Sequence, residues 1–159
     1  MTLPKPLAAL MVPLLFAMAC AASTAARADE FDVPPEVVEA FARKLQAALK
    51  QKDVAAVSSL VEFPLRINLG GGKFRRVSKA QLAKEFDQIF SPPIVKAVLD
   101  QDPAHLFQNA QGSMFGSGAV WANASCRKNE EWRPTCPVRV YVINAPEDTP
   151  ANTPANKAK

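Results

Sequence analysis

One histidine and one aspartate are the candidates for acid–base chemistry. His105 is the only histidine of the chain, and an imidazole that titrates near neutral pH can act as a general base. Paired with Asp87, it would form the dyad of a cofactor-independent lyase or isomerase. However, His105 lies at a predicted loop-to-strand junction and Asp87 lies within a predicted helix, where solvent-facing side chains are common. We therefore keep His105 and Asp87 as the enzymatic alternative and favour a protein without catalysis.

A second group of residues has the chemistry of a binding site. Arg66 matches anionic groups, Gln111 can donate and accept hydrogen bonds, and Trp121 offers a rigid apolar surface with one donor. Arg66 lies on the strand face opposite an apolar set: Phe63, Leu65 and Ile67. We therefore expect Arg66 on the outer face of the sheet and Trp121 at the rim of a pocket. The alternative is that these side chains only coat the sheet or a dimer contact.

Metal and nucleotide chemistry have no support in the sequence. Once the N-terminal segment that holds Cys20 is removed, two cysteines and one histidine remain, too few for a four-ligand zinc site. Residues 70–73 (Gly-Gly-Gly-Lys) lack the spacing of a phosphate loop and do not lead into a predicted helix, so we interpret them as a hairpin turn. We expect no metal and no cofactor.

The N-terminal residues 1–28 are typical of a secretory signal peptide. Lys5 precedes an apolar stretch, residues 7–22, and the small-x-small pattern Ala26-Arg27-Ala28 marks a cleavage site. The sequence therefore predicts a periplasmic or secreted protein without a membrane span after cleavage. A lipoprotein acylated at Cys20 is the alternative, because the residues before this cysteine match part of a lipoprotein cleavage box.

Export would change both the charge and the redox state of the chain. Cleavage after residue 28 removes two of the nineteen basic residues and none of the fifteen acidic ones, which lowers the net charge from +4 to +2. A nucleic-acid partner is therefore not expected. In an oxidising compartment the remaining cysteines, Cys126 and Cys136, are expected to form a disulfide. A local basic patch is interpreted as solvated hairpin residues: Lys73, Arg75, Arg76 and Lys79.

Apolar spacing and capping residues predict four helices. Residues 31–50 have apolar side chains at three- and four-residue steps: Val38, Phe41, Leu45 and Leu49. Asp53 can cap a second, shorter helix. Ser78 and Gln81 form a capping-box pattern before a third helix that continues to residue 90. The Ser-Pro-Pro of residues 91–93 opens a fourth.

Alternation and β-rich composition predict the strands. Residues 61–68 alternate between apolar and polar side chains. Pro64 cannot donate to a sheet ladder, so this strand is expected at an edge or at a bulge. The glycines 70–72 turn the chain into a return strand over residues 73–77. Three further strands are expected in succession, over residues 106–111, 115–126 and 138–144.

These elements predict one α+β domain over residues 29–145, with N-terminal helices packed on a curved, mainly antiparallel sheet, and a disordered tail, residues 146–159. Several short motifs stand out: 63–68 (Phe-Pro-Leu-Arg-Ile-Asn), 86–90 (Phe-Asp-Gln-Ile-Phe), 106–112 (Leu-Phe-Gln-Asn-Ala-Gln-Gly) and 142–144 (Val-Ile-Asn). With these motifs the chain resembles a family of small exported proteobacterial proteins, itself similar to the nuclear transport factor 2-like (cystatin-like) superfamily.

The resemblance implies a cone in which helices and a curled sheet enclose a pocket. That scaffold hosts isomerases and dehydratases as well as non-catalytic binders and dimerisation modules, so it does not by itself assign a function. Ala110 replaces an expected aromatic residue and Ala119 an expected acid, which weakens the enzymatic alternative. We expect an exported envelope protein that binds a small ligand or a partner protein without catalysis. A homodimer and an immunity-type inhibitor of an envelope toxin are alternatives.

Overall fold

The computed structural model of the chain describes residues 33–126 and 136–146. The predicted signal peptide, the alternative acylation site Cys20 and the predicted tail beyond Pro146 lie outside these residues. Within the described ranges, no helix is long and apolar enough to cross a membrane. The described residues form helices and one sheet, which confirms the mixed α+β class.

The longest helix among the described residues, α1 (Pro35–Lys50), confirms the first predicted helix. It begins at a proline, whose fixed φ suits a first helical turn and whose missing N–H is not needed there. Its apolar face is buried, as the spacing predicted: Val38, Phe41, Leu45 and Leu49. Burial of this face, rather than intrinsic propensity, is what stabilises a helix of this length.

Four shorter helices follow. Asp53 caps α2 (Val54–Ser59) by accepting a hydrogen bond from the Ala56 N–H. The predicted capping box of Ser78 and Gln81 is present and starts α3 (Lys79–Lys84). The third predicted helix was expected to continue to residue 90, but it breaks at Glu85, and α4 (Phe86–Ile89) is a separate turn. Helix α5 (Pro92–Leu99) confirms the fourth.

In the part of the chain that the structure describes, six strands form a single sheet in the order β2-β1-β6-β5-β4-β3. Neighbouring strands are antiparallel except β1 and β6, which are parallel. This confirms a mainly antiparallel sheet, with one parallel pairing that was not predicted. The strands are β1 (Val61–Gly70), β2 (Lys73–Val77), β3 (Phe107–Asn109), β4 (Gly112–Phe115), β5 (Val120–Ala124) and β6 (Val138–Asn144).

The strand predicted over residues 115–126 is present only in part, as β5, and the strand predicted over residues 106–111 is shortened to β3. A 3-10 turn, Gly116–Gly118, separates β5 from β4, a strand that was not predicted. Gly116 and Gly118 both have positive φ, a conformation that glycine adopts without a steric penalty. A side chain at Gly116 would also collide with α5, because its Cβ would lie 2.3 Å from that of Ala97. The turn therefore lies directly against the helix.

Pro64 was expected at an edge or at a bulge, and only the second alternative is correct. Strand β1 lies inside the sheet, between β2 and β6. Its register with β6 shifts between Val61 and Arg66, so Pro64 falls in the irregular stretch. The Phe63–Pro64 peptide bond in this stretch is cis. An irregular stretch tolerates a residue that cannot donate to the ladder.

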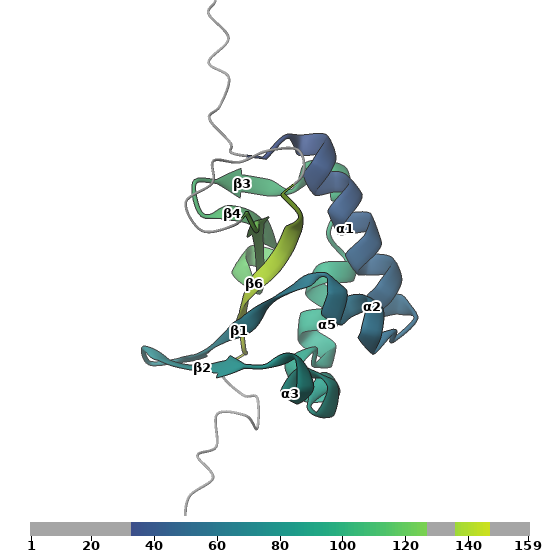
Figure 1. The fold of residues 1–159 in the computed structure, drawn as a ribbon. Coiled ribbons are helices and arrows are strands. Elements are labelled where there is room, and N and C mark those ends of the chain that lie inside the picture. The colour runs from purple at the N-terminus through teal and green to yellow at the C-terminus, as the bar shows by residue number, and fades with distance from the viewer. Residues whose placement is uncertain (1–32, 127–135, 147–159) are drawn as a thin grey trace, which may run out of the picture.

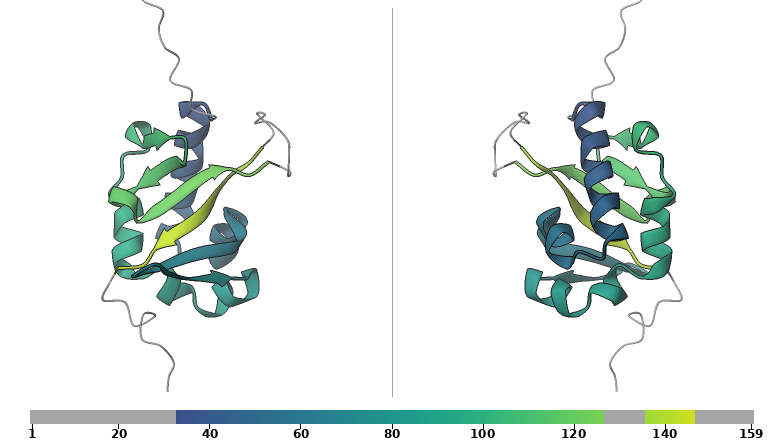
Figure 2. Two further views of the ribbon diagram at one scale, coloured as in Figure 1. Left: turned by 90° about the vertical axis from the view of Figure 1, so that its left-hand side faces the viewer. Right: turned by 90° about the vertical axis from the view of Figure 1, so that its right-hand side faces the viewer.

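The helices lie on one face of the sheet (Figure 1). In the left view of Figure 2 the strands lie in front of α1, and in the right view α1 lies in front of the strands. Apolar side chains fill the layer between them, and Phe41 of α1 meets Phe115 of β4 edge to face with ring centroids 6.4 Å apart. Gln46 links α1 to the end of α5 by donating to the carbonyls of Val98 and Gln101.

The predicted disulfide is present. Cys126 and Cys136 are bonded, with their Cα atoms 4.8 Å apart. Cys126 lies two residues after β5 ends, and Cys136 lies two residues before β6 begins. The bond therefore joins the antiparallel strands β5 and β6 where they leave the sheet.

Candidate functional site

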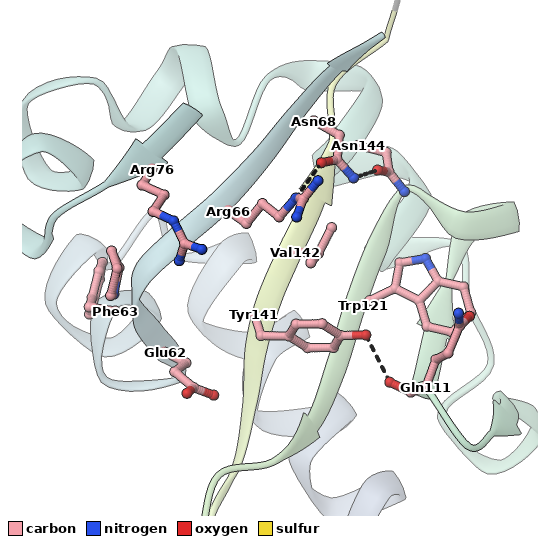
Figure 3. A pocket seen from close by; sticks show the side chains of 11 residues that line it. Glu62, Phe63, Arg66, Asn68, Arg76, Gln111, Trp121, Tyr141, Val142 and Asn144 are labelled. Carbon is pink, nitrogen blue, oxygen red and sulfur yellow. Dashed lines mark hydrogen bonds between the residues drawn. The ribbon is translucent and has the colours of Figure 1, made fainter. Parts of the chain in front are cut away.

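The sheet face away from α1 contains a hollow of about 510 Å³ (Figure 3). That volume is in the range of small-molecule sites. Its wall mixes two arginines, several amides, three aromatic side chains and one carboxylate. The lining residues are Glu62, Phe63, Pro64, Arg66, Asn68, Arg76, Gln111, Trp121, Tyr141, Val142 and Asn144.

All three residues predicted to bind a ligand or partner line this hollow. Arg66 comes from β1, Gln111 from the turn between β3 and β4, and Trp121 from β5. Leu65 and Ile67 are buried on the helix side, so Arg66 lies on the outer face, as the alternation predicted. The outer face and the pocket were expected to be different places, whereas the hollow lies on the outer face itself.

The placement of Phe63 differs from the prediction. It was expected with Leu65 and Ile67 on the helix side, but it is half-buried and also lines the hollow. The register shift between Val61 and Arg66 is the physical reason, because a bulge changes which way successive side chains point. Phe63 therefore contributes to the apolar wall of the hollow.

A chain of hydrogen bonds orients Arg66. Its Nε–H donates to Asn68 Oδ1 at 2.7 Å, and Asn68 Nδ2 donates to Asn144 Oδ1 at 2.7 Å. Asn144 Nδ2 in turn donates to the carbonyl of Gly118. The Arg66 guanidinium also lies 4.1 Å from the ring centroid of Phe74, a cation–π contact. Within the described residues, no hydrogen bond engages the terminal nitrogens of Arg66, so they can contact a ligand.

A second arginine lies beside the first. Arg76 of β2 is the direct cross-strand partner of Arg66 and lines the same hollow. Like charges at directly opposed positions destabilise a strand pair. Among the described residues, neither arginine forms an ion pair, and the one carboxylate in the wall, Glu62, is exposed. An anion bound between the two guanidinium groups would relieve this repulsion.

Tyr141 enters the hollow through an irregularity in β6. The register with β5 moves from Trp121–Val142 to Ala122–Val140, so Tyr141 is an extra residue in its strand. Its hydroxyl donates to the carbonyl of Gln111 at 2.8 Å. Burial raises the pKa of the Tyr141 phenol, which therefore stays protonated and uncharged at neutral pH.

Arg76, Tyr141 and Asn144 also line the hollow and were not predicted as site residues. Arg76 was interpreted as part of a solvated patch, although a hairpin register counted from the glycine turn places it opposite Arg66. Tyr141 and Asn144 belong to β6, whose bulge and parallel pairing with β1 involve residues far apart in the sequence. No local signal could have identified them.

His105 and Asp87 are not brought together. His105 Nδ1 lies 2.7 Å from Asp102, and that contact, followed by a backbone hydrogen bond from Ala104, lowers the pKa of the Asp102 carboxyl. Asp87 instead forms an ion pair with Lys52. Both side chains are exposed, 82% for His105 and 81% for Asp87. The dyad of the enzymatic alternative is therefore absent from the described residues.

The hollow presents groups that can contact a ligand. It offers positive charge, amide donors and acceptors, and apolar walls, and neither His105 nor Asp87 lines it. The described residues also contain no cluster of three His, Cys, Asp or Glu side chains that could hold a metal ion. Comparison of the chain with models of protein families, with curated proteins and with solved structures gave no match.

Proposed function

We propose that this chain is an exported envelope protein that binds a small anionic ligand in the hollow of its sheet and leaves it chemically unchanged. One observation carries the proposal: Arg66, Gln111 and Trp121 come from separate parts of the chain and meet in one hollow. Residues brought together in this way can contact one ligand at the same time. An anion is favoured because Arg66 and Arg76 have no carboxylate partner among the described residues.

The cellular location is part of the proposal. The Cys126–Cys136 bond is compatible with an oxidising compartment, such as the periplasm or the exterior of the cell. In that setting, residues 1–28 would direct export and be removed. A cone-shaped architecture related to the nuclear transport factor 2-like superfamily is also part of the proposal. Anion binding in the hollow does not depend on it.

Calorimetry with small anions tests the proposal. Benzoate, succinate and an acidic hexapeptide are titrated into the protein and into Arg66→Gln and Trp121→Ala variants that retain their circular dichroism spectrum. We expect one-to-one binding of at least one small anion, weakened about tenfold by Arg66→Gln because a charge-assisted hydrogen bond is lost. Arg43→Gln is the matched control, because Arg43 is an exposed cation on α1. The Arg43→Gln variant should bind each anion as tightly as the parent protein does.

Three outcomes would overturn the proposal. Equal binding by the folded Arg66→Gln and Trp121→Ala variants would place the ligand elsewhere. Binding of the acidic peptide alone would point to a protein partner. Conversion of the bound compound, detected by its own NMR spectrum after incubation, would establish an enzyme.

A further inference from the structure

One residue from each strand lies in a single row across the open face of the sheet. Each is the direct cross-strand partner of the next, so all six side chains leave the same face. Adjacent strands are about 4.8 Å apart, so the five steps of the row span about 24 Å. From β3 through β4, β5, β6 and β1 to β2, the row is Phe107, Met114, Trp121, Val142, Arg66 and Arg76.

The row is apolar at one end and cationic at the other. Its first four side chains are apolar, and Arg66 and Arg76 complete it. Phe107 is 53% exposed, which is unusual for a large hydrophobic residue in this structure. The uncovered face of an antiparallel sheet ordinarily carries polar side chains. A continuous apolar stretch there marks a surface that binds something.

Two hollows adjoin along this row. The first holds Arg66 and Arg76, and the second, of about 630 Å³, has a largely apolar wall that includes Met114 and Ile94. Trp121 and Asn144 line both. Figure 3 shows Val142 between the guanidinium of Arg66 and the indole of Trp121, so the apolar surface adjoins the cationic one.

The Gly116–Gly118 turn supports this junction. A Cβ placed on Gly118 would lie 3.7 Å from both the Met114 sulfur and the Trp121 ring nitrogen, so the turn backbone is close to both side chains. The Gly118 carbonyl also accepts the hydrogen bond from Asn144, the last in the series of hydrogen bonds that begins at Arg66. The cationic and apolar parts of the row are therefore held by one connected set of contacts.

We propose that the ligand is an amphipathic, single-chain organic anion of the carboxylate class. This inference rests on the proposed function and specifies its ligand. The carboxylate binds between Arg66 and Arg76, whose planar forks match its two oxygens. The hydrocarbon body crosses Val142, Trp121 and Met114 toward Phe107, a distance of about 15 Å at the strand spacing. A small molecule is favoured because it can enter hollows of this size, whereas a bilayer surface cannot follow a concave wall.

A chain-length series tests the inference by calorimetry. The probes are butanoate, octanoate and dodecanoate, each below its micelle concentration, and dodecan-1-ol, which lacks the charge. Affinity should rise about twofold per added CH₂, since the open row removes each group only partly from water. Dodecan-1-ol should bind about tenfold more weakly than dodecanoate.

Two variants separate the ends of the row. Phe107→Ser, at an exposed position that the core does not need, should weaken dodecanoate about threefold and leave butanoate unchanged. Arg66→Gln should weaken every carboxylate about tenfold. Arg43→Gln removes an exposed cation from α1 and should change the binding of neither butanoate nor dodecanoate.

Each contrary result has a separate meaning. Carboxylate binding that depends on Arg66 but not on chain length overturns the amphipathic ligand and leaves the proposed function standing. Equal binding of dodecan-1-ol and dodecanoate overturns the role of the charge. Binding to phosphatidylglycerol vesicles without binding of free dodecanoate would replace the small molecule with a membrane surface. If Arg66→Gln leaves the binding of every carboxylate in the series unchanged, and also that of benzoate, succinate and the acidic hexapeptide, the inference and the proposed function both fail.

Discussion

Replacing Asn68 with alanine should loosen Arg66 and destabilise the fold by a measurable amount. The Asn68 side chain accepts one hydrogen bond from the charged Arg66 and donates another to Asn144, both at 2.7 Å and both partly buried. A bond to a charged group contributes about 1.5 kcal/mol and a neutral one about 1 kcal/mol. Because partial exposure lets water replace some of each bond, we expect Asn68→Ala to lower the free energy of unfolding by about 2 kcal/mol.

Thermal and urea unfolding measure this loss. A domain of this size shifts its Tm by about 4 °C for each kcal/mol, so the expected decrease is about 8 °C. Asn123→Ala is the control, because Asn123 is also a half-buried asparagine of the sheet. In the described part of the chain its side chain bonds only to Ala124 and, at 3.4 Å, to Gln111. The free energy of unfolding of Asn123→Ala should fall by less than about 1 kcal/mol.

A double-mutant cycle with Arg66→Ala isolates the contact itself. The coupling free energy between Arg66 and Asn68 should be about 1 kcal/mol, since the two residues share a direct hydrogen bond. If Asn68→Ala unfolds within about 0.5 kcal/mol of the parent and shows no coupling, the idea that Asn68 holds Arg66 in place is refuted.

Three further predictions concern the frame of the site. Gly116→Ala should lower the free energy of unfolding by about 3 kcal/mol, because its Cβ collides with α5. Gly71 also has a positive φ but lies in open space, so Gly71→Ala should lower the free energy of unfolding by about 1 kcal/mol. Urea unfolding of both variants tests this difference. Replacing Cys126 and Cys136 with serine opens a loop with a sequence separation of 10 and should cost about 3 kcal/mol in the same assay. Tyr141 is the only tyrosine, so the phenolate absorbance of the folded chain should appear at higher pH than that of the unfolded chain, and stability should fall as pH rises through the unfolded pKa of about 10. Coincident titration curves in the folded and unfolded states would contradict this.

The helices were predictable because their signals are local. The apolar spacing of α1 and the caps at Asp53 and Ser78 each involve residues within a few positions, and all three are present in the structure. The break at Glu85 was missed because the apolar residues on both sides of it keep a helical spacing. The spacing records which side chains are buried and not whether the backbone between them is continuous.

The sheet was less predictable because its pairings are not local. Nothing near β1 indicates that it pairs in parallel with β6, which lies about seventy residues later. In β6, simple alternation from Val138 and Val140 would bury Val142 and expose Ile143. The bulge at Tyr141 reverses this: Ile143 is buried and Val142 lines the hollow. One inserted residue changes the face of every later side chain in the strand.

The candidate site was predicted in part for the same reason. The parity of β1 placed Arg66 on the outer face because Leu65 and Ile67, its buried neighbours, lie within one residue of it. That Trp121 lies in the same hollow depends on β6 running between β5 and β1. Such an arrangement follows from the assembled sheet and not from either strand alone.

The most direct test of the anion-binding face is a two-dimensional ¹H–¹⁵N NMR titration of the protein with dodecanoate. We expect the largest shift changes at the backbone amides of Met114, Trp121 and Arg66 and at the indole N–H of Trp121. The described residues offer the hydrocarbon chain a competing surface, an apolar groove of about 520 Å³ between α1, α4 and α5. Shift changes centred on this groove, with Trp121 and Arg66 unaffected, would contradict the account; its wall includes Leu49, Phe86, Phe90, Val95 and Leu99.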